Sequence, residues 1–389
     1  MNTKQMIYLD HGASTPVHPA VLTAMQPHWT EIYGNASATH GYGRAAARTL
    51  VQAREEIAAI LHAHPDEIIF TGCGSESDNL AVRGAMLAAR HTNGRNHLIT
   101  SAIEHSAVLN TAVQLRDLFN FDLTILPVDE YGRVRPSDVA AAIRSDTALI
   151  SIMAANNEIG TLQPVRAIGE IAREHGVLFH TDAIQAAAVQ EWHMDDWPVD
   201  MLSIAPHKFY GPKGVGVLYA RRGIELVPVM TGGGQEKGLR PGTSNVAFAV
   251  GAAKAMALAA DDMAARNAHY RQLRDTLIQG MLAAFPDDCR LTGHPSERLP
   301  HSASFAFRHL SGNDLLIHLD MAGFAVSSGS ACKSGDPKPS RVLEAIGLAP
   351  EWTKGGLRVT VGAQNSISDI KAFLSVIPDV VGKMKTFAV

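Results

Sequence analysis

The sequence predicts an α/β protein with a large, mostly parallel sheet and a smaller α+β domain. Between about residues 65 and 225, short apolar runs such as "EIIFTG" and "HLITSAIEH" alternate with longer helical patterns. Strands separated by helices of this length are typical of a parallel sheet that is covered on both faces. The last third carries "HSASFAF", "LLIHLDMAG" and "GLRVTVG", a mixture that indicates a second, α+β unit.

The chain is long enough for more than one domain. Its 389 residues correspond to two or three domains of ordinary size. The Ala-rich stretch 246–285 has a helical pattern, and a long helix there would leave the sheet domain and begin the next one. We therefore expect a large domain at 15–260 and a small domain formed by 1–14 and 261–389. The segment "MIYLDHGASTPV" is too short to stand alone and should pack against one or both domains.

Composition argues against several classes of protein. A net charge of −4 gives no reason to expect direct binding of nucleic acid or of an anionic membrane surface. No apolar run approaches the ~18 residues of a membrane span, and no leader-like segment begins the chain, so the expected location is the cytoplasm. Cys73, Cys289 and Cys332 show no CxxC or Cys/His spacing. This argues against a disulfide framework, and no metal site is expected.

The stretch "SSGSACKSGD", residues 327–336, gives Cys332 an unusual setting. A free cysteine is most often a small buried residue of the core. Glycine and serine are instead typical of a mobile, solvated loop. Because little around Cys332 could bury it, we expect this thiol to take part in chemistry.

Ligands of open α/β sheets bind at the carboxyl ends of the strands. Ser75 follows the run "EIIFTGCG" and is expected to cap the next helix, whose free N–H groups could hold a phosphate. A simple strand-to-helix turn is the alternative interpretation. Asp182 ends the strand of "FHTDAIQ", where its carboxylate would either meet a cationic ligand atom or cap a helix.

Lys208 has the most specific setting of the strand-end residues. It follows the apolar run of "SIAPHK" and precedes a Gly/Pro-rich turn and a second apolar strand. Poor solvation there would lower the pKa of its amine and make it a nucleophile. His105 ends another strand, in "AIEHSAV". Each residue alone has an ordinary structural explanation, but a phosphate cradle, an amine, an acid and a ring together fit pyridoxal 5'-phosphate.

The chain resembles the NifS/IscS-type cysteine desulfurases, which have the class V aminotransferase fold, a pyridoxal-phosphate-dependent transferase fold of type I. The matching stretches occur in family order and cover the chain nearly end to end. They are "YLDHGASTPV", "YGNASATHGYGR", "FTGCGSESDNLA", "IEHSAVL", "ANNEIGT", "HTDAIQ", "HKFYGPKGVGVLY", "GGGQEKGLRPGTSN" and "SSGSACKSGDPKPSRVLEAIG".

The resemblance implies a role for each candidate residue. Lys208 would bind the cofactor covalently and remove the Cα proton of the substrate, His105 would stack on the cofactor ring and shuttle protons, and Asp182 would pair with the ring nitrogen. Gln185 would bind the phenolic oxygen of the ring, with Asn157 nearby. The phosphate would be held by Gly74, Ser75, His207 and Thr243, the last from the other subunit of a homodimer. The substrate would be bound by Asn35, Asn157 and Arg358, with Arg358 on its carboxylate.

The reaction implied by the resemblance converts L-cysteine to L-alanine. The sulfur moves to Cys332 as a persulfide and then to a sulfur-acceptor protein, such as an iron–sulfur scaffold or a tRNA or DNA thiolation protein. Two alternatives are a class V aminotransferase or lyase that acts on another amino acid, and a non-catalytic protein of this fold that serves as a scaffold or sulfur carrier.

The sequence departs from the family pattern at several positions. Ala205 stands where the family usually has Ser or Thr, whose hydroxyl binds the phosphate. A hydrogen bond to a charged group contributes ~1.5–3 kcal/mol, so weaker binding of the cofactor is expected. Cys73 stands where glycine is usual, and Gly12 and Ser14 change the N-terminal motif.

Overall fold

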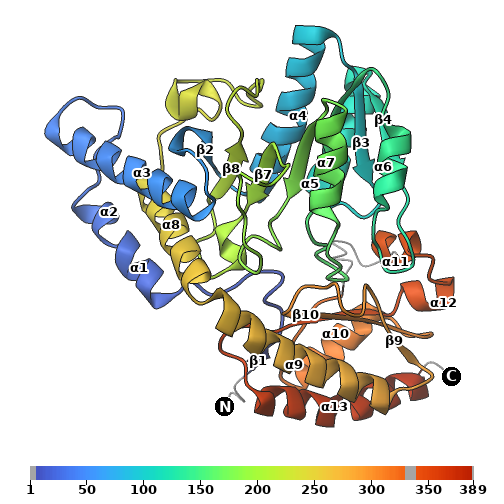
Figure 1. Ribbon diagram of the computed structural model, residues 1–389. Helices are drawn as coiled ribbons and strands as arrows, with labels where there is room; N and C mark the ends of the chain where they lie inside the picture. Colours follow the sequence, from blue (N-terminus) through green and yellow to red (C-terminus); the bar gives the residue numbers. More distant parts are fainter. Residues whose placement is uncertain (1–5, 329–338, 388–389) are drawn as a thin grey trace.

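The computed structural model describes residues 6–328 and 339–387 (Figure 1). It confirms the predicted α/β architecture. A large sheet of seven strands is accompanied by a three-stranded sheet and by a short two-stranded one. In Figure 1 the three-stranded sheet and the helices beside it lie below the large sheet.

The large sheet is mostly parallel, in the order β2-β8-β7-β6-β5-β3-β4. Its strands are β2 (Ile68–Thr71), β3 (His97–Ser101), β4 (Asp122–Leu126), β5 (Thr147–Ser151), β6 (Leu178–Asp182), β7 (Met201–Ile204) and β8 (Gly216–Ala220). Strand β8 runs antiparallel to both of its neighbours, β2 and β7. The other pairs are parallel.

Helices connect and cover these strands. In the first two thirds of the chain they are α1 (Pro19–Met25), α2 (Pro27–Thr30), α3 (Gly41–Ile60), α4 (Gly74–Asn93), α5 (Ser106–Phe119), α6 (Pro136–Ala142), α7 (Val165–Glu174) and α8 (Val246–Asp261), with 3-10 turns at Pro65–Glu67, Pro206–Lys208 and Gln235–Gly238. In the remainder they are α9 (Met263–Ala284), α10 (Gly312–Met321), α11 (Arg341–Ala345), α12 (Pro350–Thr353) and α13 (Ile367–Phe387).

The large sheet buries both of its faces, which explains why its strands are continuous apolar runs. Side chains alternate between the faces along a strand. Ile69 of β2 therefore joins a cluster with α4 and α5. Its neighbours Ile68 and Phe70 join the cluster on the other face, to which α3, α7 and α8 contribute. The edge strand β4 is the exception, since it is only partly buried.

The sequence pattern suggested one long helix in the Ala-rich stretch 246–285, but the structure has two helices there. Asp262 has φ −117° and ψ 17°, and its non-helical backbone separates α8 from α9. Helix α8 packs with the large sheet, while α9 contributes Leu273 and Leu277 to a second core.

The second core surrounds the antiparallel sheet β12-β10-β9. Its strands are β9 (Cys289–Leu291), β10 (Ser302–Phe307) and β12 (Gly356–Thr360). The N-terminal strand β1 (Ile7–Tyr8) pairs with β11 (Phe324–Ala325), and Leu9 belongs to this core. The division into domains at residue 260 stays a prediction. None of the described helices is both apolar and long enough to cross a membrane.

Candidate active site

Most of the predicted site residues line one cavity of about 300 Å³ at the carboxyl ends of the strands. They come from segments far apart in the chain, and the parallel strand order brings them to the same edge of the sheet. The predicted residues on its wall are Gly74, Ser75, His105, Asn157, Asp182, Gln185, His207, Lys208 and Arg358.

The amino group of Lys208 lies in this cavity and is bound by the backbone of the N-terminal segment. Its Nζ donates hydrogen bonds to the carbonyl oxygens of Gly12 (2.8 Å) and Ala13 (2.9 Å). Burial, and next the charge of Arg358, lower the pKa of the Lys208 amine to about 8. The neutral, nucleophilic amine is therefore accessible near physiological pH, as the sequence predicted.

Asp182 and His105 lie close to each other on the cavity wall. Atoms of their side chains, together with the carboxylate of Asp78, lie within 4.8 Å of one another. Burial raises the pKa of Asp182, whose Oδ1 accepts the backbone N–H of Ile184 at 2.9 Å. A cationic partner in the cavity would favour the ionised carboxylate.

His105 begins helix α5, and its ring orientation follows from that position. Its Nδ1 accepts the N–H of Ala107 at 3.1 Å, so the proton of the neutral ring lies on Nε2. Burial lowers the pKa of His105. The side chain of neighbouring Glu104 is buried away from solvent, where it accepts hydrogen bonds from the Ser101 hydroxyl and the Met153 N–H.

The N-terminus of α4 forms one end of the cavity. The helix begins at Gly74, and the side chain of its N-cap residue, Cys73, makes no capping hydrogen bond. The expectation that Ser75 caps the helix is therefore wrong. Ser75 instead lies in the first turn with an exposed side chain on the cavity wall. The uncapped N–H groups of this turn and the helix dipole suit a phosphate.

Close packing at Gly74 forms part of this cradle. A Cβ at position 74 would approach Cδ1 of Ile184 to 2.4 Å and Cβ of Ala205 to 3.1 Å. Nearby, Nδ1 of His207 lies 3.2 Å from the hydroxyl of Ser14, and burial lowers the pKa of His207 to about 4. The neutral His207 ring is thus a hydrogen-bonding group rather than a charge.

Arg358 is a buried residue of the cavity wall. Its guanidinium donates to Oδ1 of Asp10 (2.9 Å) and to the carbonyl oxygen of Asn157 (2.8 Å). Its Nε is buried without a hydrogen-bond partner in the described chain. Each of its two terminal nitrogens has a second N–H, so donors remain for an incoming carboxylate. Asp10 had no predicted role, although it lies within the N-terminal motif "YLDHGASTPV".

Asp78 is a second residue near the cavity for which the sequence predicted no role. It is fully buried in α4, and neither of its carboxylate oxygens has a hydrogen-bond partner in the described chain. Its Oδ1 lies 3.7 Å from Nε2 of His180, which is also fully buried. Burial, and next the charge of Asp182, raise the pKa of Asp78 well above its ordinary value. Burial beside Asp182 therefore favours the protonated, neutral form of the Asp78 carboxyl.

Three predicted residues are not part of this cavity as described. Asn35 and Thr243 are exposed and line other parts of the surface of their own chain. Thr243 borders a separate cavity of about 200 Å³ with Arg240. Cys332 lies outside the described residues.

The cavity has the donor set that pyridoxal phosphate needs. It offers a lysine amine of lowered pKa for covalent binding, a buried carboxylate, an imidazole ring and an uncapped helix N-terminus for the phosphate. The residues present therefore fit the cofactor.

Comparisons with known proteins agree with this geometry. Residues 7–373 match the family described as Aminotransferase class-V. The cysteine desulfurase IscS of Dictyoglomus turgidum is 43% identical over 385 residues, which are 99% of this chain and 97% of that protein. A solved NifS-like protein has a TM-score of 0.90 at 34% identity, covering 97% of this chain and 100% of its own. SspA, solved in complex with cysteine, has a TM-score of 0.78 at 37% identity, covering 91% and 98%.

Covalent attachment of added pyridoxal phosphate to the cofactor-free protein should depend on pH. Because the pKa of Lys208 is about 8, the rate should rise about tenfold per pH unit below that value and level off above it. In Arg358→Leu the midpoint should move to higher pH, because a neighbouring positive charge is lost. The measurement is the mass of the borohydride-reduced adduct against time. Arg222→Leu, an exposed control, should keep the wild-type midpoint.

Asp78→Asn should change how stability depends on pH. In wild type the folded state holds the Asp78 proton above the pKa of the unfolded chain, so this residue makes stability fall as pH rises, by at most about 1.4 kcal/mol per pH unit. The amide cannot ionise, and urea unfolding between about pH 5 and 8 should give a flatter curve. The exposed control Asp287→Asn should follow wild type. Parallel curves for Asp78→Asn and wild type would contradict the protonated state.

Proposed function

The chain belongs to the class-V aminotransferase family, and we propose that it acts as a cysteine desulfurase whose sulfur acceptor is Cys332. The observation that supports this most directly is the arrangement of Lys208, Asp182, His105 and Arg358 around one cavity. Relatives of this length and similarity are named cysteine desulfurases, and a similar protein has been solved with cysteine. The substrate is L-cysteine, the cofactor is pyridoxal phosphate, and sulfur passes on to an acceptor protein.

Different residues of the cavity are proposed to bind different parts of the cofactor. The first turn of α4, with Gly74 and Ser75, would hold the phosphate together with His207. Asp182 would pair with the ring nitrogen and Gln185 with the phenolic oxygen, and Asn157 lines the same cavity. Pyridoxal phosphate, when bound, supplies an electron sink for the bonds at the substrate Cα.

Proton transfer falls to Lys208 and His105. The Lys208 amine, with its lowered pKa, takes the Cα proton of L-cysteine. His105 presents Nε2 to the cavity because its Nδ1 is bound to the N–H of Ala107. Arg358 holds the substrate carboxylate with the donors that Asp10 and Asn157 leave free.

The sulfur transfer requires a thiolate, for which we propose Cys332. Its thiolate attacks the sulfur of the substrate, the S–S bond forms as the Cβ–S bond breaks, and proton uptake at Cβ gives L-alanine. Support comes from the described residues on either side of it. Ser327 exchanges backbone hydrogen bonds with Arg358 at 3.1 and 2.6 Å. From Ser328, a chain of four residues spans at most about 14 Å.

The chain beyond the Cys332 segment is also attached to the cavity wall. The Ser340 hydroxyl donates to Oε2 of Glu158 at 2.7 Å, next to Asn157. The guanidinium of Arg341 donates to the carbonyl oxygen of Glu104 at 3.1 Å, next to His105. Both flanks of the segment that contains Cys332 are therefore held beside residues of the site.

We propose further that two copies of the chain form the working unit and that Thr243 completes the phosphate site of the partner. Thr243 is exposed, and the chain just before it is held by Arg240, whose Nε donates to Glu76 in the first turn of α4 at 3.0 Å. Asn35 is likewise exposed and is proposed to reach substrate. The delivered sulfur goes to an iron–sulfur scaffold or to a tRNA or DNA thiolation protein.

Cys332→Ser separates cofactor chemistry from sulfur transfer. The variant should keep pyridoxal phosphate on Lys208 but release no sulfide from L-cysteine under reductant, because the hydroxyl is not an effective acceptor of sulfur. Cys289→Ala, which removes a thiol buried in the second core, should still release sulfide. Mass spectrometry should find one added sulfur on Cys332 of wild type. Sulfide release by Cys332→Ser at the wild-type rate would refute its role.

Ala205→Ser should strengthen binding of the cofactor. The methyl group of Ala205 faces Gly74 at the start of α4, where the phosphate is expected. An added hydroxyl there supplies a hydrogen bond to a charged group, which corresponds to about tenfold slower loss of pyridoxal phosphate on dilution. Ala155→Ser adds a hydroxyl to the same cavity wall and serves as the control, with no comparable gain. Equal off-rates for Ala205→Ser and wild type would show that the missing hydroxyl is compensated elsewhere.

A further inference from the structure

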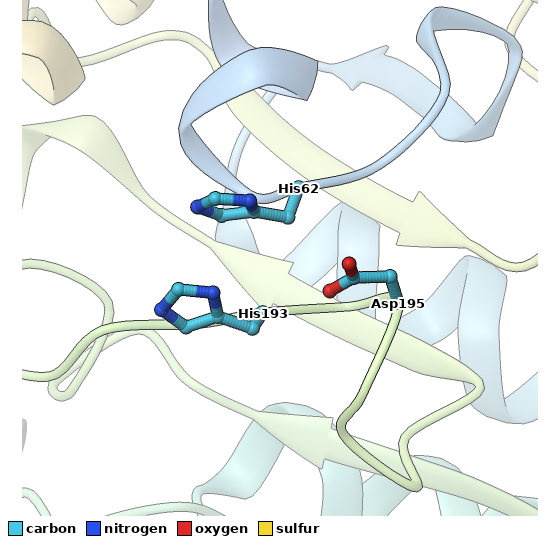
Figure 2. Close-up of side chains that lie close together, drawn as sticks. All are labelled: His62, His193 and Asp195. Atoms are coloured by element: carbon cyan, nitrogen blue, oxygen red, sulfur yellow. The ribbon is translucent and has the colours of Figure 1, made fainter.

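A second group of potential ligands lies apart from the active-site cavity. Ring nitrogens of His62 and His193 and a carboxylate oxygen of Asp195 all lie within 4.8 Å of one another (Figure 2). In Figure 2 the two rings lie face to face and the carboxylate lies beside them. No other residue of the described chain makes a hydrogen bond to these three side chains. The carboxylate of Glu191 lies near the ring of His193, with Oε2 3.6 Å from Nε2. The proposed desulfurase reaction uses none of them.

The fold brings His62 to this place through the end of α3. The residue has a φ of 51°, in the left-handed region that commonly ends a helix. Its N–H donates to the carbonyl oxygen of Ala59, and the N–H of Ala63 donates to that of Ala58. The position of the imidazole ring is therefore set by a hydrogen-bonded helix terminus.

Buried and more exposed residues alternate along residues 192–195, which places His193 and Asp195 on the same side of this segment. Trp192 and Met194 are buried, and the residues between and after them point outward. The N–H of Met194 donates to the carbonyl oxygen of Leu61 at 2.9 Å. This backbone bond holds the His193 segment against the residue that precedes His62.

These three side chains are better suited to binding a cation together than to lying this close to one another without one. The ring centroids of His62 and His193 are 4.1 Å apart with an interplanar angle of 25°. Two imidazolium ions at that spacing repel each other, whereas two neutral rings offer lone pairs to a metal ion. Two imidazoles and a carboxylate are typical ligands of Zn²⁺ and similar divalent transition metals, while Ca²⁺ and Mg²⁺ prefer oxygen.

We propose that His62, His193 and Asp195 bind one divalent transition-metal ion, with Zn²⁺ the best match. Bonds of about 2.0–2.2 Å require tetrahedral ligand atoms to lie about 3.4 Å apart, so the two rings must rotate out of their stacked arrangement to bind one ion, which the partial or full exposure of these side chains permits. Oε2 of Glu191 lies 3.6 Å from Nε2 of His193 and favours the tautomer that leaves Nδ1 for the metal. The open coordination positions adjoin a cavity of about 300 Å³.

The ion would connect two parts of the chain that are far apart in the sequence. His62 directly follows Leu61, the residue that caps the end of α3, and the segment with His193 follows Asp182 and Gln185 along the chain. A metal ion that binds only the folded state stabilises it by RT ln(1 + c/Kd), where c is the concentration of the ion, so the stability rises with the logarithm of the ion concentration above Kd. The proposed role is therefore structural, and it is independent of sulfur transfer.

The test is a titration of the holoenzyme with ZnCl₂ and, separately, with CoCl₂. A Cys332→Ser background keeps that thiol from supplying a ligand. Calorimetry should show saturable binding of one Zn²⁺, and Co²⁺ should give a d–d absorption band. His62→Ala and His193→Ala should each weaken Zn²⁺ binding by about tenfold or more, since even second-shell changes cost that much. His91→Ala, an exposed histidine in the last turn of α4, should bind as the parent does.

Stability and activity measurements complete the test. Zn²⁺ should raise the Tm of the parent, and EDTA should reverse the rise, with no such shift in the two histidine variants. If a histidine variant fails to fold, Asp195→Asn takes its place, because this near-isosteric change should also weaken Zn²⁺ binding and reduce the Tm shift. Desulfurase activity of folded variants should be unchanged without added metal, which separates this proposal from the function of the active site. Equal Zn²⁺ affinity in all variants, or no saturable binding, would overturn it.

Discussion

The site depends on an amine that is held by backbone carbonyl groups rather than by a carboxylate. Nζ of Lys208 donates to the carbonyl oxygens of Gly12 and Ala13, which are neutral acceptors. A carboxylate in their place would stabilise the ammonium form and raise its pKa. The same two bonds attach the N-terminal segment to the large sheet, while β1 attaches it to β11 beside the second core. These two bonds thus fix the position of the amine and of the chain around it, while burial and the charge of Arg358 lower its pKa.

Around this amine, several acids share a space that solvent hardly reaches. Asp78, Asp182 and Glu104 are all buried, and burial raises the pKa of each. Close carboxylates in a poorly solvated place cannot all ionise, so their protonation states are coupled. A cationic ring nitrogen beside Asp182 would select the ionised form there and leave the proton on Asp78. Asp78 would then be a protonated, uncharged carboxyl group behind the ionised carboxylate of Asp182.

The strands and strand-end residues could be predicted because both follow from local pattern. Buried parallel strands are continuous apolar runs, and polar residues that end them converge at one edge, as Asp182 and Lys208 do. The failures have physical causes as well. Ser75 is a good capping residue, yet the chain turns two residues earlier, at Cys73. The break at Asp262 between α8 and α9 interrupts a stretch that is helical on both sides, so composition gave no signal. His62 and His193 meet only through the contact of Met194 with Leu61, which no spacing in the sequence encodes.

The reversed direction of β8 has a geometric effect on catalysis. Because β8 returns between β7 and β2, its first residue, Gly216, pairs with Thr71 at the point where the chain turns toward α4. A Cβ on Gly216 would lie 2.5 Å from the carbonyl carbon of Cys73. A larger residue at 216 would push the helix terminus outward while Lys208 stayed on the neighbouring turn. Because Gly216 has no side chain, the start of α4, which is expected to hold the phosphate, can lie this close to β8.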